Sequence, residues 1–187
     1  MQITKTLHVT DRKAWRLWLK EHHNSETEIW LVYHLNKSGK PRIPYNDAVE
    51  EALCYGWIDS TMKKFEDNIN AQRFSPRKKN SNLSEMNKVR IRRLIKAKKM
   101  TKFGLESIKH HLDEHASPKE FELPEDILKE LRSDPIVWKN FQKFPKYYQQ
   151  IRIGWIDGTR KRPEEFRKRL RYFMKMTQMN KKFGMVR

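Results

Sequence analysis

Apolar side chains recur at three- and four-residue spacing in two early segments, residues 11–22 and residues 45–55. This spacing gathers them on one stripe, so both segments are predicted to be amphipathic helices. Thr10 or Asp11 suits the N-cap of the first helix, and Gly56 is expected to end the second. The stripes contain Trp15, Trp18, Leu19 and His22 in the first helix and Ala48, Val49, Ala52 and Leu53 in the second.

Between and after these helices the pattern changes to β-branched and aromatic residues, which favour strands. Residues 28–35 predict one strand, and residues 57–65 and 69–75 predict two more. The polar residues 66–68 separate the last two strands, so we expect a hairpin there. Pro76 is expected to end the second strand of that hairpin.

A long basic helix is predicted from Leu83 to Met100, with Asn82 as its cap and Glu85 three residues later. Its apolar positions fall on one side of the helix and basic residues fall on the other. The apolar side holds Met86, Leu94, Ala97 and Met100, and the basic side holds Lys88, Arg92 and Lys99. Gly104 is expected to interrupt this pattern before a further short helix.

The rest of the sequence is predicted to be helical, with helices at residues 125–131 and from Pro135, Pro145 and Pro163, and a frayed tail from Thr177. Together the elements predict an α+β fold, in which a small antiparallel sheet is packed by helices and followed by an all-helical C-terminal segment. The expected division is an α+β N-terminal domain at 1–115, a linker at 116–123 and a helical C-terminal domain at 124–187.

Composition makes the chain strongly basic, with 41 Lys and Arg against 23 Asp and Glu and a formal net charge of +18 over 187 residues. The aromatic content of 11% is typical of a folded protein rather than a disordered polyelectrolyte. Such a charge favours polyanions and phosphorylated or carboxylated small molecules, and it also serves solubility.

A single cysteine, Cys54, excludes a disulfide framework, an iron–sulfur cluster and a zinc site built on several cysteines. No apolar run approaches the length of a membrane span, and residues 1–5 precede no apolar signal core. We therefore expect a cytoplasmic protein without a membrane span. The sequence gives no indication of the oligomeric state.

Several infrequent residues stand at fixed offsets in both halves of the chain. They are residues 52–59, residues 72–77, Ser81, Ser84 and Asn87 in the first half, and Asp134, Pro135, Trp138, Phe141, Pro145, Tyr148 and Trp155 in the second. In these positions the sequence resembles the YdeI/OmpD-associated family, whose members are also labelled bacteriocin-protection proteins. The resemblance implies a small bacterial protein with no established reaction and a role in tolerance of bacteriocins or cationic antimicrobial peptides.

The candidate ligand-binding residues surround the predicted hairpin and the start of the basic helix. They are Trp57, Asp59, Gln72, Arg73, Arg77, Ser81, Ser84 and Asn87. Guanidinium groups suit bidentate capture of carboxylate or phosphate, and hydroxyl and amide groups at a helix start add donors. We expect the arginines and the helix start to converge around Asp59 and to bind an anionic ligand. In the structural alternative, Asp59 pairs with Arg73 or Arg77 to lock the hairpin, and the serines cap the helix.

Two further functions remain open. A nonspecific nucleic-acid binder would use Lys78, Lys79, Lys88, Arg92 and Lys99 on phosphates. An enzyme would use Asp59 and Arg73 on a small anionic substrate. The sequence favours a non-enzymatic binding protein, because it contains no nucleophile elbow, phosphate-binding glycine loop or dinucleotide fingerprint.

We expect no cofactor and no metal. His111 and His115 are four residues apart, but no third ligand is evident from the sequence. Cys54 falls on an apolar helix stripe, where a free cysteine behaves as a small core residue. No catalytic residue is therefore assigned.

Overall fold

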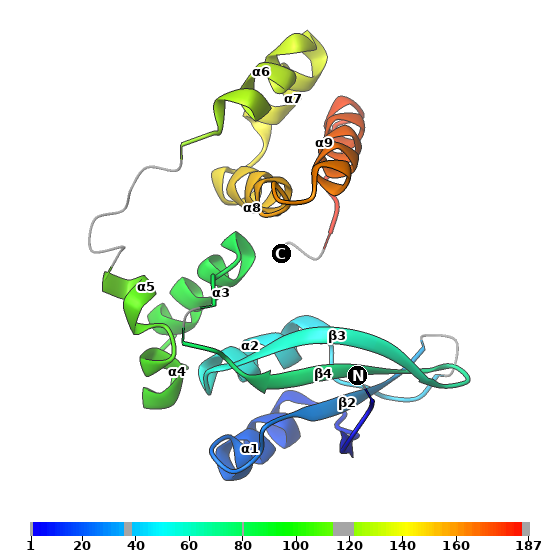
Figure 1. Cartoon of the computed structure of the whole chain (residues 1–187), viewed down its shortest axis with the longest axis vertical. Helices are drawn as coiled ribbons and strands as arrows, with labels where there is room; N and C mark the ends of the chain where they lie inside the picture. The colour runs from blue at the N-terminus through cyan, green and yellow to red at the C-terminus, as the bar shows by residue number, and fades with distance from the viewer. Residues whose placement is uncertain (1, 36–38, 80, 114–121, 185–187) are drawn as a thin grey trace. The chain divides into compact units, whose positions relative to one another are not determined.

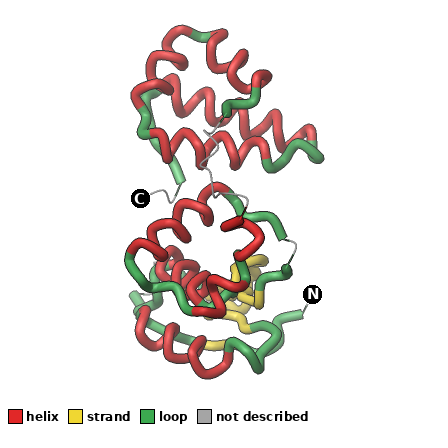
Figure 2. Tube along the Cα trace, turned by 90° about the vertical axis from the view of Figure 1, so that its left-hand side faces the viewer, coloured by secondary structure: helices red, strands yellow, loops and turns green. Residues whose placement is uncertain are grey.

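A computed structural model describes residues 2–35, 39–79, 81–113 and 122–184, and it divides the chain into two compact units. The N-terminal unit comprises Met1–Ser81 and Arg90–Glu114, and the C-terminal unit comprises Asn82–Val89 and His115–Arg187. Among the described residues, all strands belong to the N-terminal unit (Figures 1 and 2). The predicted α+β class is confirmed.

The sheet of the N-terminal unit has four strands in the order β1-β2-β4-β3. The strands are β1 (Thr6–Leu7), β2 (Ile29–His34), β3 (Trp57–Glu66) and β4 (Ile69–Pro76). The predicted hairpin is β3–β4, and β4 also pairs antiparallel with β2. The sheet is mixed rather than purely antiparallel, because β1 pairs parallel with β2. A strand of two residues carries no alternation that a sequence pattern could reveal.

Two helices, α1 (Arg12–His22) and α2 (Tyr45–Cys54), form the core of the N-terminal unit with the sheet. Asp11 caps α1 as predicted, accepting hydrogen bonds from the backbone N–H groups of Lys13 and Ala14. Trp15 is fully buried, contacts the ring of Phe74 on β4 and donates its indole N–H to the Ala48 carbonyl at 2.9 Å. The predicted apolar stripes of both helices therefore meet over one face of the sheet.

Three further helices follow the sheet: α3 (Glu85–Lys96), α4 (Lys102–Glu106) and α5 (Lys109–Asp113). The prediction for α3 was wrong at both ends. Ser84 rather than Asn82 caps it, because the Ser84 hydroxyl accepts the backbone N–H of Asn87 at 3.2 Å. The helix ends before Met100, since Lys98 adopts a left-handed conformation with φ of 54°. Gly104 lies inside α4 and does not interrupt the helical pattern there.

The C-terminal unit contains α6 (Glu125–Ser133), α7 (Pro135–Lys143), α8 (Lys146–Asp157) and α9 (Pro163–Gln178). Their starts at prolines agree with the predictions, and the Asp134 carboxylate caps α7. The buried core consists of Ile127, Leu131, Val137, Phe141, Phe144, Tyr148, Ile153, Ile156 and Phe173. The tail predicted to fray at Thr177 is instead helical to Gln178, and Thr177 itself is buried.

The predicted linker at 116–123 lies outside the described residues except for residues 122 and 123. In the part of the chain that the structure describes, no helix combines the length and apolar character needed to cross a bilayer.

Candidate anion-binding site

Arg77 stands out in the N-terminal unit because its guanidinium group is buried without a counter-charge. It follows β4 directly, and its backbone N–H donates to the Gly56 carbonyl at 2.8 Å. Only 8% of Arg77 is exposed, and its Nη2 donates to the Ser81 carbonyl. Its Nε and Nη1 are buried and have no hydrogen-bond partner among the described residues. Burial lowers the pKa of Arg77, because desolvation disfavours the cation.

Arg77 lines a pocket of about 380 Å³ that belongs entirely to the N-terminal unit. Aromatic side chains and basic groups dominate its wall, and Glu106 is its acidic residue. The aromatic residues are Tyr55, Trp57 and Phe103, and the basic residues are His23, Arg77, Lys79 and His110. The pocket therefore combines an apolar surface with several groups that can donate to an anion.

Close backbone packing places α4 against the end of α2 and so builds one side of the pocket. Gly104 lies so near the carbonyl of Cys54 that an added Cβ would overlap its oxygen. Thr101 supports the same contact, with its hydroxyl donating to the Cys54 carbonyl at 2.6 Å. Gly56 has a φ of +75°, and a Cβ there would come within 2.9 Å of Ser107. These two glycines let Phe103 approach the pocket.

His23 adds a second unpartnered polar group. Its Nδ1 lies 2.9 Å from the Leu19 carbonyl, which can only accept, so Nδ1 carries the proton of that hydrogen bond. Its Nε2 is buried and has no partner among the described residues. The ring packs 4.2 Å, centroid to centroid, from Phe103. With the ring proton on Nδ1, Nε2 is able to accept a hydrogen bond from a ligand hydroxyl.

The expected convergence of Arg73 and Asp59 does not form. In the strand register, Asp59 lies opposite Phe74, whereas Arg73 lies opposite Trp30. Neighbouring residues of a strand point to opposite faces, so Arg73 is directed away from the face that carries Phe74 and Asp59. Arg73 pairs instead with Glu28, with its Nε 2.7 Å from the carboxylate. The Asp59–Arg73 pair, which the enzyme alternative needed and which was one of two pairs considered for the structural lock, is therefore absent. The other pair of the lock is also absent, because the only hydrogen bond of the Arg77 guanidinium among the described residues is to the Ser81 carbonyl.

Asp59 has a different partner, since the hydroxyl of Tyr45 donates to its carboxylate at 2.5 Å. Burial raises the pKa of Tyr45, and the nearby negative charge of Asp59 raises it further. Arg90 lies in the same electrostatic environment, and its Nη2 donates to the Asn46 side chain at 2.6 Å. Asp59 thus belongs to a polar cluster beside α2 rather than to the lining of the Arg77 pocket.

The remaining predicted ligand residues have local structural roles. Gln72 is buried, and its amide lies 3.4 Å from the Arg73 carbonyl. The Ser81 hydroxyl donates to the Lys78 carbonyl at 2.8 Å. Ser84 caps α3. Asn87, three residues later, is buried in the C-terminal unit. Of the eight predicted residues, Trp57 and Arg77 line the pocket.

Two family models match the chain, one in each half. Residues 7–107, more than half of the chain, match a family described as Domain of unknown function (DUF8412). The chain belongs to the DUF8412 family. Residues 120–180 match the family described as Bacteriocin-protection, YdeI or OmpD-Associated, which confirms the resemblance to the YdeI/OmpD-associated family. Neither the curated proteins nor the solved structures contain a match to this chain.

The Arg77 pocket lies within the DUF8412 match except for His110, and so does the block at residues 52–77 that carried much of the sequence resemblance. The sequence could not indicate His23, Tyr55, Phe103 and His110 as pocket residues, because they come from four separate segments that meet only in the fold. His23 carried one weak signal, as a polar residue directly after the first helix.

The predicted basic stripe of the nucleic-acid alternative is formed only in part, with Arg92 exposed on α3. Lys88 pairs with Glu85 at 2.7 Å, and Lys99 lies beyond the end of α3. Arg90, on the same helix, is buried rather than presented to solvent. Lys78 and Lys79 are exposed beside the pocket, and Lys79 is part of its lining.

The other groups considered for chemistry are the thiol of Cys54 and possible metal ligands. Cys54 is buried, and desolvation raises the pKa of its thiol to about 11, which keeps it protonated and poorly nucleophilic at neutral pH. The described residues include no group of three or more His, Cys, Asp or Glu side chains that could hold a metal ion. His115, one of the predicted four-residue pair, lies outside the described residues.

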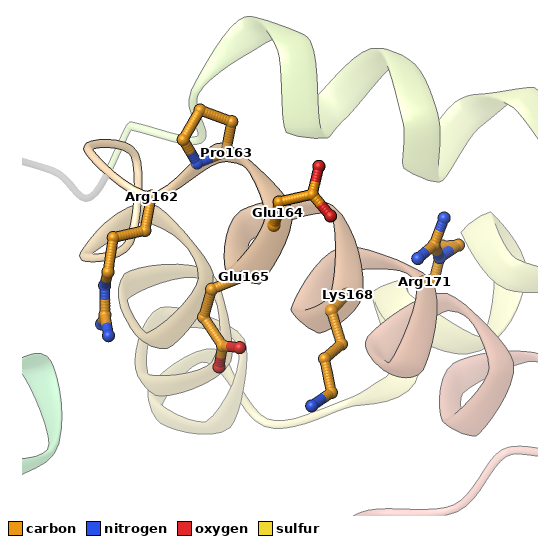
Figure 3. A pocket seen from close by; sticks show the side chains of 6 residues that line it. All are labelled: Arg162, Pro163, Glu164, Glu165, Lys168 and Arg171. Carbon is orange, nitrogen blue, oxygen red and sulfur yellow. The ribbon is translucent and has the colours of Figure 1, made fainter.

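A second pocket, of about 440 Å³, lies at the start of α9 in the YdeI/OmpD-associated segment (Figure 3). Its lining carries both signs of charge, from Arg162, Glu164, Glu165, Lys168 and Arg171. Glu164 pairs with Arg167 and Glu165 pairs with Arg169, each at 2.8 Å. None of the residues that line it is a buried, unpartnered cation, so this pocket lacks the feature that distinguishes the Arg77 pocket.

Proposed function

We propose that the protein binds a small anionic molecule in the Arg77 pocket of its N-terminal unit. The buried guanidinium of Arg77, with two nitrogens that have no partner among the described residues, is the observation that supports this proposal. Burying a charge without a partner costs roughly several kcal/mol of desolvation free energy. An oxyanion that accepts hydrogen bonds from both N–H groups offsets that cost. Planar guanidinium groups hold carboxylate and phosphate oxygens in a fixed two-bond geometry.

The wall of the pocket narrows the ligand class. Its volume of about 380 Å³ fits a compact metabolite rather than a polymer. The aromatic rings of Tyr55 and Phe103 offer an apolar surface on which a flat ring can pack. His23 Nε2, which has no partner among the described residues, can accept a hydrogen bond from a hydroxyl group on the body of the ligand. The expected ligand therefore joins one oxyanion group to an aromatic or apolar body.

Calorimetric titration with phenyl phosphate and inorganic phosphate tests the proposal. We expect phenyl phosphate to bind more tightly than inorganic phosphate, because only the former uses the aromatic wall. In the Arg77→Met variant, which keeps an unbranched, flexible side chain but loses its donors, affinity is expected to fall about tenfold or more. Arg73→Met is the matched control, since Arg73 is paired with Glu28 on the other face of the sheet.

Unchanged binding by Arg77→Met, or equal losses in both variants, contradicts the proposal. Thermal unfolding of each variant without ligand separates a loss of binding from a loss of the fold. If phenyl phosphate shows no binding while inorganic phosphate binds, the site is an anion site without the proposed aromatic subsite.

We further propose that this binding supports tolerance of bacteriocins or cationic antimicrobial peptides. The description of the family matched at residues 120–180 supports the proposal by its name. A strain lacking the gene is expected to be more sensitive to a cationic peptide, and the wild-type gene is expected to restore tolerance. An Arg77→Met gene that restores tolerance fully would separate the protective role from the pocket.

A further inference from the structure

One face of α9 in the C-terminal unit presents a line of basic side chains to solvent. Lys168, Arg171 and Lys175 are three and four residues apart, so they lie on one side of the helix. All three residues are exposed, and none of their side chains makes a hydrogen bond or ion pair with a described residue. Figure 3 shows Lys168 and Arg171 following Glu164 and Glu165 along the helix. We call these three residues the α9 stripe.

Among the described residues, no acidic side chain forms an ion pair with the stripe, although the hydrogen bond from Arg169 and, to a lesser degree, the charge of Lys168 lower the pKa of Glu165. Glu164 and Glu165, in the first turn of α9, are paired with Arg167 and Arg169 rather than with stripe residues. Acids at this end of a helix also face the positive end of its dipole, which explains their position. From Lys168 to Gln178 the helix carries no acidic residue. The positive charge of the stripe therefore remains available to a partner.

The opposite face of α9 is fixed in the core of the C-terminal unit. Phe173 and Thr177 are fully buried, and Phe166 and Leu170 pack against the same core. An amphipathic helix that inserts into a bilayer needs a free apolar face, and α9 has none to offer. The partner must therefore be recognised by charge presented at a rigid surface.

We propose that the α9 stripe binds the phosphate backbone of single-stranded nucleic acid without sequence preference. Lys168 and Lys175 lie seven residues apart, which is about 10 Å at a rise of about 1.5 Å per residue. Because long Lys and Arg side chains extend this reach, we expect the stripe to contact about three phosphates of a strand. Tyr172 lies on the same side and is 46% exposed. Its ring packs edge-to-face with Phe183 at 4.8 Å between centroids, and its exposed part can stack on a base between phosphate contacts.

Fluorescence anisotropy with a labelled mixed-sequence oligonucleotide of about 12 nucleotides tests the proposal. Three phosphate contacts on a single strand predict a slope of about −2 in log affinity against log salt concentration. The same slope corresponds to a loss of affinity of roughly twentyfold between about 50 and about 200 mM salt. Replacing two contacts in Arg171→Gln/Lys175→Gln is expected to reduce the magnitude of the slope by about 1.4.

Lys13→Gln/Lys20→Gln is the matched control, because it removes the same charge from two exposed lysines of α1 in the N-terminal unit. We expect this control to keep the wild-type slope and affinity within about twofold. Tyr172→Ala is expected to weaken binding about fivefold or more without changing the slope. Arg77→Met is expected to bind the oligonucleotide normally, so this proposal and the pocket proposal fail independently.

Equal losses in the two double variants would show that net charge alone drives association, and would overturn the proposal. So would binding to vesicles containing anionic phosphatidylserine without binding to the oligonucleotide. Loss of binding in Tyr172→Ala together with a reduced slope would contradict the assigned division between stacking and phosphate contacts.

Discussion

The carboxylate of Glu51 connects α1 to α2, and its removal provides a quantitative test of the fold. Glu51 is only 3% exposed, yet it accepts from Arg12 Nε at 2.8 Å and from Arg16 Nη1 at 2.6 Å. Removing one partner of a buried ion pair costs about 3–5 kcal/mol, because the remaining charge loses its partner. Here the side chains of Arg12 and Arg16 are 31% and 37% exposed, and Arg12 also pairs with Asp47 and Glu50, so water and these carboxylates recover part of that cost.

We therefore expect Glu51→Gln to lower the free energy of unfolding by about 2–3 kcal/mol. Urea denaturation followed by tryptophan fluorescence measures this, since Trp15 and Trp18 lie on α1. Asp67→Asn is the control, because its pairing with Lys64 joins side chains that are 91% and 73% exposed. A loss below about 1 kcal/mol for Glu51→Gln, or equal losses in both variants, would refute the contribution to stability that we assign to the ion pairs of Glu51.

Three further predictions concern packing, capping and the thiol. Gly104→Ala is expected to lower the free energy of unfolding by about 1–3 kcal/mol, because its Cβ overlaps the Cys54 carbonyl, and an unchanged urea midpoint would contradict that close approach. Asp134→Ala removes the cap of α7 and is expected to cost about 1 kcal/mol, whereas Asp134→Asn, which can still cap, should retain most of it. Cys54 favours its protonated form more in the folded than in the unfolded state, so its contribution is fully present below the unfolded pKa of about 9 and decreases as pH rises toward about 11. Rapid alkylation of the folded protein at pH about 8 would argue against this assignment.

Much of the fold could be read from the sequence because its signals are local. The hairpin strands, the Asp11 cap and the proline starts of α7 and α9 each depend on a few consecutive residues. The charge pattern could not predict which face of the sheet the Arg73 side chain lies on, because a shift of one residue in strand register moves a side chain to the other face. An irregularity between Asp59 and Met62 adds a further shift of register that the sequence pattern does not reveal.

The candidate site was less accessible to sequence reasoning. Arg77 was identified from its chemistry, but the partners His23 and Phe103 are more than 20 residues distant in the chain. These residues come together because the chain packs closely at Gly56 and Gly104. The sequence around the two glycines does not indicate this packing. The end of α3 was missed for a related reason, because Lys98 takes a backbone conformation that glycine usually supplies.

Helix α3 divides between the two units, with its first residues assigned to the C-terminal unit and the remainder to the N-terminal unit. Glu85 packs so closely on Gly154 of α8 that an added Cβ there would overlap its side chain. A fragment cut at the boundaries of the two family matches, 7–107 and 120–180, would separate Glu85 from α8. The first residues of α3 therefore lie within the first family match but belong to the C-terminal unit. Cutting the chain at the boundaries of the family matches would divide that unit.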